Sequence, residues 1–181
     1  MSRPRWSVLS LAAALLLAGC GGDDGGGPGA SGGSTSVVTT TTLVPPGLVA
    51  PIDQVLPGQC FDQLPDEAQR PYAVLAIPCE ESHHFEIFQR LPYRDGNGKA
   101  VPRGYPYPGE TAVRTSAEDE ETGCYAAFAG WMGIDWTKSD YDIQSWWPSA
   151  DSWAKHDRVI TCAVFRFDGD ATKGSVRGTE Q

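Results

Sequence analysis

The sequence predicts a small α+β domain that is stapled by disulfides and follows a flexible linker. Short apolar runs have the length of strands, and residues 117–132 repeat apolar side chains at helical spacing. Residues 20–50 are rich in glycine, serine, threonine and proline, a composition typical of linkers. We therefore expect a mixed or antiparallel sheet with one main helix. An even number of cysteines follows the linker: Cys60, Cys79, Cys124 and Cys162.

Residues 1–20 contain the parts of a secretory signal. Arg3 and Arg5 form a positively charged start, and residues 7–18 form a short apolar core. That core is too short for a stable membrane-spanning helix, which needs about 20 apolar residues. Small residues stand just before Cys20, where a signal peptidase would cut.

Residues 17–20, Leu-Ala-Gly-Cys, resemble the bacterial lipobox. In that group of signals the cysteine thiol receives a diacylglycerol, and a peptidase then cuts just before it. The resemblance implies a lipoprotein with residues 1–19 as its signal peptide. Acyl chains such as palmitate on Cys20 would hold it at the extracytoplasmic face of the cell membrane, at about 0.8 kcal/mol per buried CH₂. The alternative is an ordinary signal peptide with a chance cysteine.

The segment of residues 20–50 has too few apolar side chains to offset the entropy of ordering it, so it is predicted to be a tether. The ordered domain is expected over residues 51–181. The whole chain has a net charge of -9, and loss of residues 1–19, with two arginines and no acid, changes this to -11. An acidic chain repels nucleic acid, so no nucleic-acid partner is expected.

Four cysteines in an exported domain predict two disulfides, and four allow three pairings. The sequence favours Cys60–Cys79 and Cys124–Cys162, because these pairs are near neighbours along the chain. Each disulfide is expected to contribute about 3–4 kcal/mol in the chain-entropy account. A zinc site is the alternative, but the sequence has no CxxC or HxxxH spacing.

Two strands are predicted in the first half of the domain. Residues 72–77 are a short apolar run bounded by a proline. Residues 84–91 read as a second strand, with Phe85, Ile87 and Leu91 on one face.

Residues 158–167 give the strongest strand signal and are apolar enough for a central place in the sheet. Residues 95–98 predict a turn, residues 102–109 an irregular loop, and residues 149–155 a short helix.

The main helix is predicted over residues 117–132, capped by Ser116 and ended by Gly133. Four acids at residues 118–121 would lie at its positive end. Its buried face is expected to carry Cys124, Phe128, Trp131 and Met132.

A family resemblance covers roughly residues 58–178. The motifs that carry it are Cys60-Phe-Asp62, Ile77-Pro78-Cys79 with His83, Gly123-Cys124, Pro148 with Trp153, Asp157-Arg158-Val-Ile-Thr-Cys162 and Gly174-Ser175-Val-Arg-Gly178. In this order they resemble the septum formation domain of actinobacterial exported and membrane proteins. The resemblance implies a link with cell division and carries over no catalytic residue. In relatives the residue before Asp157 is often glycine, whereas here it is His156.

A metal site can be imagined around Glu81, His83, His84 and Glu86. On a strand, however, adjacent histidines point to opposite faces, and metal binding needs three or four convergent groups. We therefore expect no metal, and expect His83 to bond to the backbone near Cys79.

Five of the six tryptophans lie between residues 131 and 153. Trp131 and Trp153 are expected in the core. Trp146 and Trp147 are adjacent, so one of them is expected to be exposed and, with Tyr141, to form a binding surface. Core packing of these aromatic residues is the favoured alternative.

These observations favour a non-enzymatic protein of the cell envelope that binds an envelope protein or a cell-wall partner and uses no cofactor. Catalysis has little support, because GxSxG is missing and Ser152, His156 and Asp157 crowd one short stretch. The alternative is a glycan-acting enzyme or glycan-binding module that uses the Trp-rich segment; a carboxylate pair for sugar cleavage stays open.

Overall fold

The computed structural model describes residues 42–64 and 73–181. The predicted signal peptide, Cys20 and most of the predicted linker lie outside the described residues. Within the described ranges, no helix has both the length and the apolar character needed to cross a membrane.

A six-stranded sheet forms the centre of the domain, in the order β1-β3-β2-β5-β7-β6, and every neighbouring pair is antiparallel. This confirms the α+β class with an antiparallel sheet. The short strands β4 and β8 pair separately. The strands are β1 (Val49–Pro51), β2 (Cys60–Gln63), β3 (Ala73–Ile77), β4 (Ser82–His83), β5 (Phe85–Pro92), β6 (Tyr141–Trp146), β7 (Val159–Arg166) and β8 (Thr172–Lys173).

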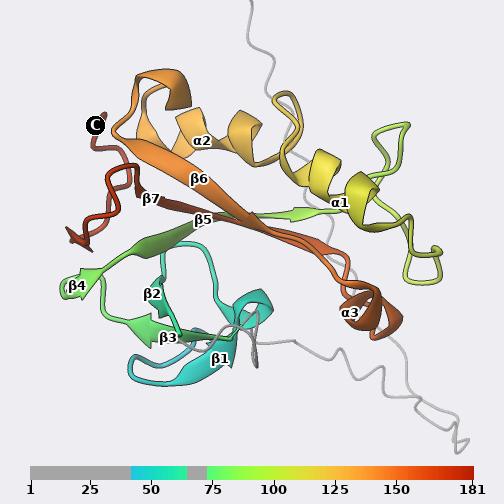
Figure 1. Cartoon of the computed structure of the whole chain (residues 1–181), viewed down its shortest axis with the longest axis horizontal. Helices are drawn as coiled ribbons and strands as arrows, with labels where there is room; N and C mark the ends of the chain where they lie inside the picture. The colour runs from blue at the N-terminus through green and yellow to red at the C-terminus, as the bar shows by residue number, and fades with distance from the viewer. Residues whose placement is uncertain (1–41, 65–72) are drawn as a thin grey trace, which may run out of the picture. The chain divides into compact units, whose positions relative to one another are not determined.

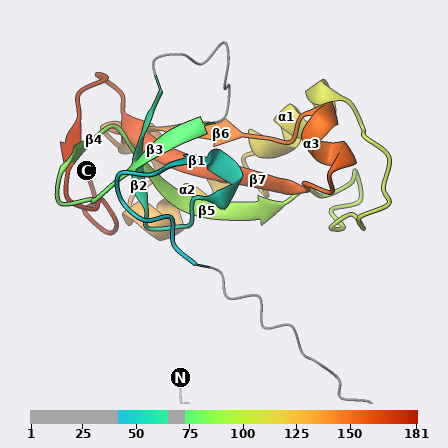
Figure 2. The same ribbon diagram turned by 90° about the horizontal axis from the view of Figure 1, so that it is seen from below.

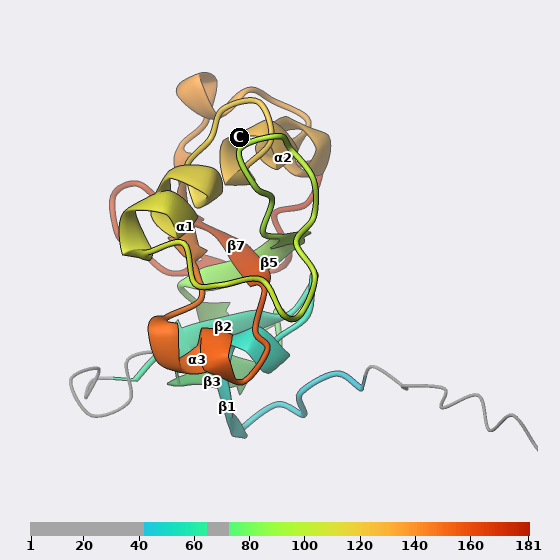
Figure 3. The same ribbon diagram turned by 90° about the vertical axis from the view of Figure 1, so that its right-hand side faces the viewer.

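The sheet is covered on both faces. Helices α1 (Glu110–Ala117) and α2 (Cys124–Met132) lie on one side of β5, β7 and β6, and strands β1, β2 and β3 lie on the other (Figures 1 and 2). β2 joins β5 through only two residue pairs, so the three N-terminal strands turn away at this junction. The short helix α3 (Ala150–Ala154) lies at the level of β1–β3, below α1 and α2 (Figure 3).

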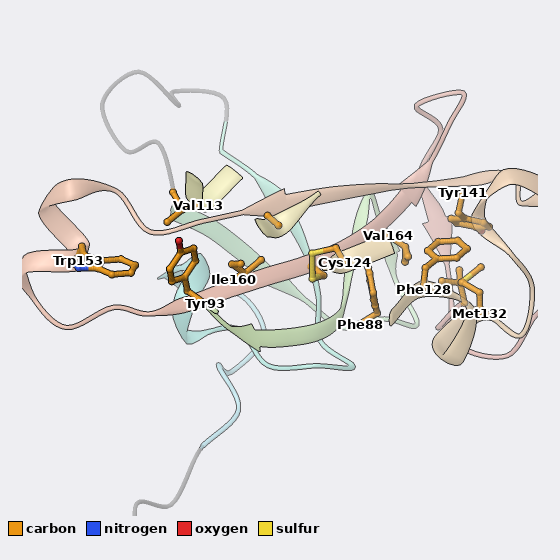
Figure 4. Packing of buried hydrophobic residues seen from close by; sticks show 13 residues of the cluster. Phe88, Tyr93, Val113, Cys124, Phe128, Met132, Tyr141, Trp153, Ile160 and Val164 are labelled. Carbon is orange, nitrogen blue, oxygen red and sulfur yellow. A yellow bond between two sulfur atoms is a disulfide. The ribbon is translucent and has the colours of Figure 1, made fainter. Parts of the chain in front are cut away.

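The helix-side core runs along β7 and β5 (Figure 4). Tyr93 and Trp153 meet edge to face at one end, and Phe88 meets Phe128 in the same way at the other. A second core on the opposite face includes Phe61, Ile87 and Trp146. Both faces of the central strands are therefore apolar, as expected for the run at 158–167.

The predicted linker boundary at residue 50 is wrong by several residues. Val44 and Ala50 are buried in the second core, and Val49–Pro51 pair with β3. The side chain of Gln59 bonds to both the backbone N–H and the carbonyl of Val44. This segment therefore belongs to the domain, as the edge strand β1 and the residues that lead into it.

The predicted helix over 117–132 is two helices. Ser116 lies inside α1, and α2 begins only at Cys124. Between them, the Asp119 carboxylate accepts hydrogen bonds from the backbone of Glu121 and from the backbone and hydroxyl of Thr122. Such local bonds compete with helix formation. They also lower the pKa of Asp119, the Thr122 hydroxyl having the largest effect.

A β-bulge in β5 corrects the predicted face of residues 84–91. The register with β7 shifts between Ile87 and Gln89, which leaves Phe88 as an extra residue. Phe85 and Ile87 face the second core as predicted, but Leu91 packs against the helix-side core. The remaining local predictions are confirmed: the strands near residues 72–77 and 158–167, the turn at 95–98, the short helix capped by Ser149, and the end of α2 at Gly133 in a left-handed conformation.

Candidate binding pocket at Trp146 and Trp147

The two disulfides have the pairing that the sequence favours. Cys60–Cys79 joins the start of β2 to the residues after β3, and Cys124–Cys162 joins the start of α2 to the middle of β7. Cys124, Cys162 and Cys60 are buried, and Cys79 is half-buried. The first bridge therefore holds β2 and the end of β3 together, and the second ties α2 to the central strand β7.

The histidine-containing segment has a structural role. His83 is buried, and its Nδ1 lies 2.9 Å from the carbonyl oxygen of Glu81, as expected. His84 lies on the outside, with its Nδ1 2.9 Å from Asp62 Oδ1. Glu86 is buried and accepts hydrogen bonds from the Ser175 hydroxyl and the Val176 N–H. The side chains of His83, His84 and Glu86 thus bond to three different partners and not to a shared position.

Trp146 and Trp147 lie at the end of β6 and face opposite sides of the sheet. The Trp146 ring is only 8% exposed and packs edge to face on Phe61 and Phe85, at centroid distances of 5.7 and 5.9 Å. Trp147 is half-buried and packs against the helix-side core. The expectation that one of them is exposed is wrong, because both faces of this sheet are covered.

Tyr141 does not belong to the same surface. It is 4% exposed, lies at the opposite end of β6 and packs in the helix-side core. Its hydroxyl is 3.4 Å from the Thr172 hydroxyl. The predicted surface of Trp146, Trp147 and Tyr141 is therefore corrected to a site that contains the two tryptophans alone.

A pocket of about 180 Å³ opens beside these tryptophans. It lies where the 3₁₀ turn at Ile52–Gln54, the end of β6, the region of α3 and the start of β7 meet. Its walls are mostly apolar, with two carboxylates and two hydroxyls among them. The lining residues are Pro51, Ile52, Asp53, Trp146, Trp147, Ser152, Asp157, Val159 and Thr161.

Some polar groups of the pocket already have hydrogen-bond partners within the protein. The Ser152 hydroxyl accepts from the Ser149 N–H at 3.0 Å and lies 3.3 Å from the Ser149 carbonyl, so it serves the capping box of α3. Asp157 Oδ1 accepts from the Val159 N–H at 3.0 Å. Asp53 is exposed. The pocket thus presents aromatic walls and negative charge, which suit binding of a small apolar or cationic group.

Arg158, beside the pocket, holds the neighbouring loop rather than a ligand. Its guanidinium lies 3.8 Å from the centroid of the Trp153 ring and donates to the carbonyls of Trp153 and Arg103. Burial lowers the pKa of Arg158, and the adjacent Asp157 carboxylate opposes this.

The backbone conformation at His156 explains why relatives often have glycine at this position. It has a φ of 73°, in the left-handed region that glycine adopts without steric cost. His156→Gly is expected to raise the free energy of unfolding by about 0.5–1 kcal/mol, the relief of left-handed strain less the added entropy of the unfolded chain. Denaturant titration of the purified protein measures this.

Lys155→Gly is the matched control for this prediction. Lys155 has a φ of -91°, where glycine relieves nothing, so this variant is expected to lose stability. A gain in Lys155→Gly equal to that in His156→Gly would contradict the argument.

The fold and its two bridges define a small disulfide-stapled α+β domain with a candidate binding pocket beside Trp146 and Trp147. The septum formation family matches residues 57–181, and the chain belongs to that family. Membership links the chain to septum formation in cell division. No curated protein and no solved structure gives a significant match.

One wall of the pocket is not predicted from the sequence. Pro51, Ile52 and Asp53 come from the segment next to the predicted linker and pack beside β7 only in the folded domain. The sequence carries one weak signal for this, the return of apolar residues at Leu48, Val49, Ile52 and Val55 near the end of the predicted linker.

Proposed function

We propose that this chain is a lipid-anchored envelope protein that binds a partner protein at the division septum without catalysing a reaction. The observation that carries the proposal is membership of the septum formation family. Two disulfides add support, because they persist in oxidising compartments outside the cytoplasm. The lipobox-like residues before Cys20 supply the anchor in this proposal.

The binding role is preferred over glycan chemistry because of the geometry at the pocket. A sugar platform needs a broad, open aromatic face, whereas Trp146 is 8% exposed, packs on Phe61 and Phe85, and leaves only a small part of its ring to line the pocket. The Ser152 hydroxyl is part of a helix cap, which weakens the set of Ser152, His156 and Asp157 as a catalytic triad.

Cys20→Ser tests the anchor. We expect the membrane-bound fraction to fall by at least about tenfold, because the acyl chains that hold the chain to the bilayer have no attachment point. Membrane fractionation and metabolic labelling with palmitate measure the two effects. Ser31→Ala, within the same linker, is the matched control and should leave both unchanged.

The septal role is tested by the position of the full chain in dividing cells. We expect immunolabelling to concentrate at septa. The control protein carries residues 1–50 fused to an unrelated exported domain, and it should label the envelope evenly. Equal labelling of the two proteins would remove the septal part of the proposal, because the anchor alone would then account for the location.

A further inference from the structure

The Trp146/Trp147 pocket combines aromatic walls with two carboxylates. Asp53 and Asp157 line it, and no lysine, arginine or histidine stands among its lining residues in the described part of the chain. A desolvated aromatic wall next to negative charge attracts a cation through both the ring quadrupole and the Coulomb interaction. The pocket is therefore complementary to a positively charged group.

Two other tryptophans of the domain already have a cationic side chain over the ring. Arg158 lies 3.8 Å from the centroid of Trp153, and Arg177 lies 4.8 Å from that of Trp131. Among the described residues, no arginine or lysine occupies the corresponding position at Trp146 or Trp147. Here a cation would have to come from another molecule.

The size of the pocket limits the occupant. Its volume is about 180 Å³, and an apolar protein cavity of about 150 Å³ accommodates benzene. A straight four-carbon chain with a terminal ammonium fits this space, whereas a sugar with its polar substituents would place hydroxyls against Ile52 and Val159. The net charge of -11 that remains after loss of residues 1–19 also attracts basic segments at long range.

We propose that this pocket binds the alkylammonium side chain of a lysine in a basic segment of a partner protein. The apolar stem lies against Trp146, Trp147 and Ile52. The ammonium is directed toward Asp53 and Asp157. This inference rests on the proposed binding function and names the chemistry of its partner.

The test uses the full chain in detergent micelles and a defined probe, Nα-acetyl-lysine methylamide. Titration is followed by the indole N–H signals in proton–nitrogen NMR spectra, assigned with Trp146→Phe and Trp147→Phe. We expect saturable shifts of the Trp146 and Trp147 signals in the millimolar range, typical of a single side chain. The norleucine derivative, which has the stem without the ammonium, is expected to bind at least about tenfold more weakly.

Charge variants locate the cation. Asp53→Asn and Asp157→Asn together are expected to weaken lysine binding by about tenfold, and Asp53→Asn alone by about threefold. Because Asp157 also holds the Val159 N–H, the single Asp53→Asn variant guards against a folding defect. Asp151→Asn is the matched control: Asp151 is an exposed acid of α3 that does not line the pocket, and its loss should change nothing.

Three results would overturn the inference. Equal binding of the lysine and norleucine derivatives would leave an apolar pocket without cation recognition. An equal loss in Asp151→Asn would assign the effect to overall charge. Binding of a cell-wall glycan fragment with shifts of the same indoles, and no response to the lysine probe, would assign the pocket to another occupant.

The lysine titration and the tests of anchoring and septal position can fail independently, so they separate this inference from the proposed function. A chain that is anchored and septal but does not respond to lysine removes the pocket inference alone. A chain that responds to lysine in micelles but is neither anchored nor septal removes the proposed function and keeps the lysine pocket.

Discussion

Replacing Cys124 and Cys162 together with alanine is expected to lower the free energy of unfolding by about 4 kcal/mol. The bridge closes a loop of 38 residues, and release of that loop raises the entropy of the unfolded chain by about this amount at 25 °C. Both sulfurs are 0% exposed in the helix-side core, so their removal also leaves unfilled space between α2 and β7. Denaturant titration of the two purified proteins measures the difference.

The second bridge supplies the control. Cys60–Cys79 closes 19 residues, so its double alanine variant is expected to lose about 3 kcal/mol. It should lose less than the first variant, because the shorter loop is cheaper to close and Cys79 is only half-buried. If loss of Cys60–Cys79 proved the more damaging, loop length and burial would not be the properties that set disulfide stability in this domain.

The sequence predicts those features that depend on neighbouring residues. The strand near 158–167 follows from an uninterrupted apolar run, and the end of α2 follows from a glycine placed after the last apolar residue. The disulfide pairing also follows from sequence proximity, because Cys124 in α2 and Cys162 in β7 are near neighbours along the chain and pack against each other in the helix-side core.

The errors occur where one local interaction competes with another. Residues 117–132 have helical periodicity throughout, yet the Asp119 carboxylate binds three nearby donors and separates α1 from α2. A single extra residue at Phe88 reverses the faces of β5, and periodicity alone does not reveal a bulge. Tyr141 and Trp146 are expected from the sequence to share a binding surface because both are aromatic. They lie instead at opposite ends of the edge strand β6.

The pocket is the least predictable feature because it is assembled from distant segments. Its walls come from residues 51–53, 146–147 and 152–161, and only the bent sheet brings them together. The sequence identifies Trp146 and Trp147 as the residues of interest, but an adjacent pair in a strand carries no information on which faces are covered. The coverage depends on β1–β3, which pack as a second layer.

Glu86→Gln is expected to lower the free energy of unfolding by about 1.5–3 kcal/mol, the range for hydrogen bonds to a charged group. Glu86 is 2% exposed, and its two carboxylate oxygens accept from Ser175 Oγ at 2.6 Å and from the Val176 N–H at 2.8 Å. Glutamine keeps the shape, but its neutral Oε1 accepts from the Val176 N–H without the help of a charge, and its Nε2 faces the Ser175 hydroxyl, which must then accept instead of donate. Denaturant titration measures the loss, and faster hydrogen exchange at Val176 locates it.

Ser175→Ala separates the two bonds. This variant removes the hydroxyl that donates to Glu86 and that accepts a long, exposed bond of 3.3 Å from the Arg177 N–H, but it leaves the buried Val176 N–H paired. Its expected loss is therefore about 1 kcal/mol and smaller than that of Glu86→Gln. The C-terminal segment also bonds to α2, through Gly178 to Trp131 and Glu180 to Met132. If Glu86 fixes this segment, Glu86→Gln should speed exchange at Gly178 and Glu180 as well. Unchanged exchange there would mean that the bonds to α2 hold the segment without the buried carboxylate.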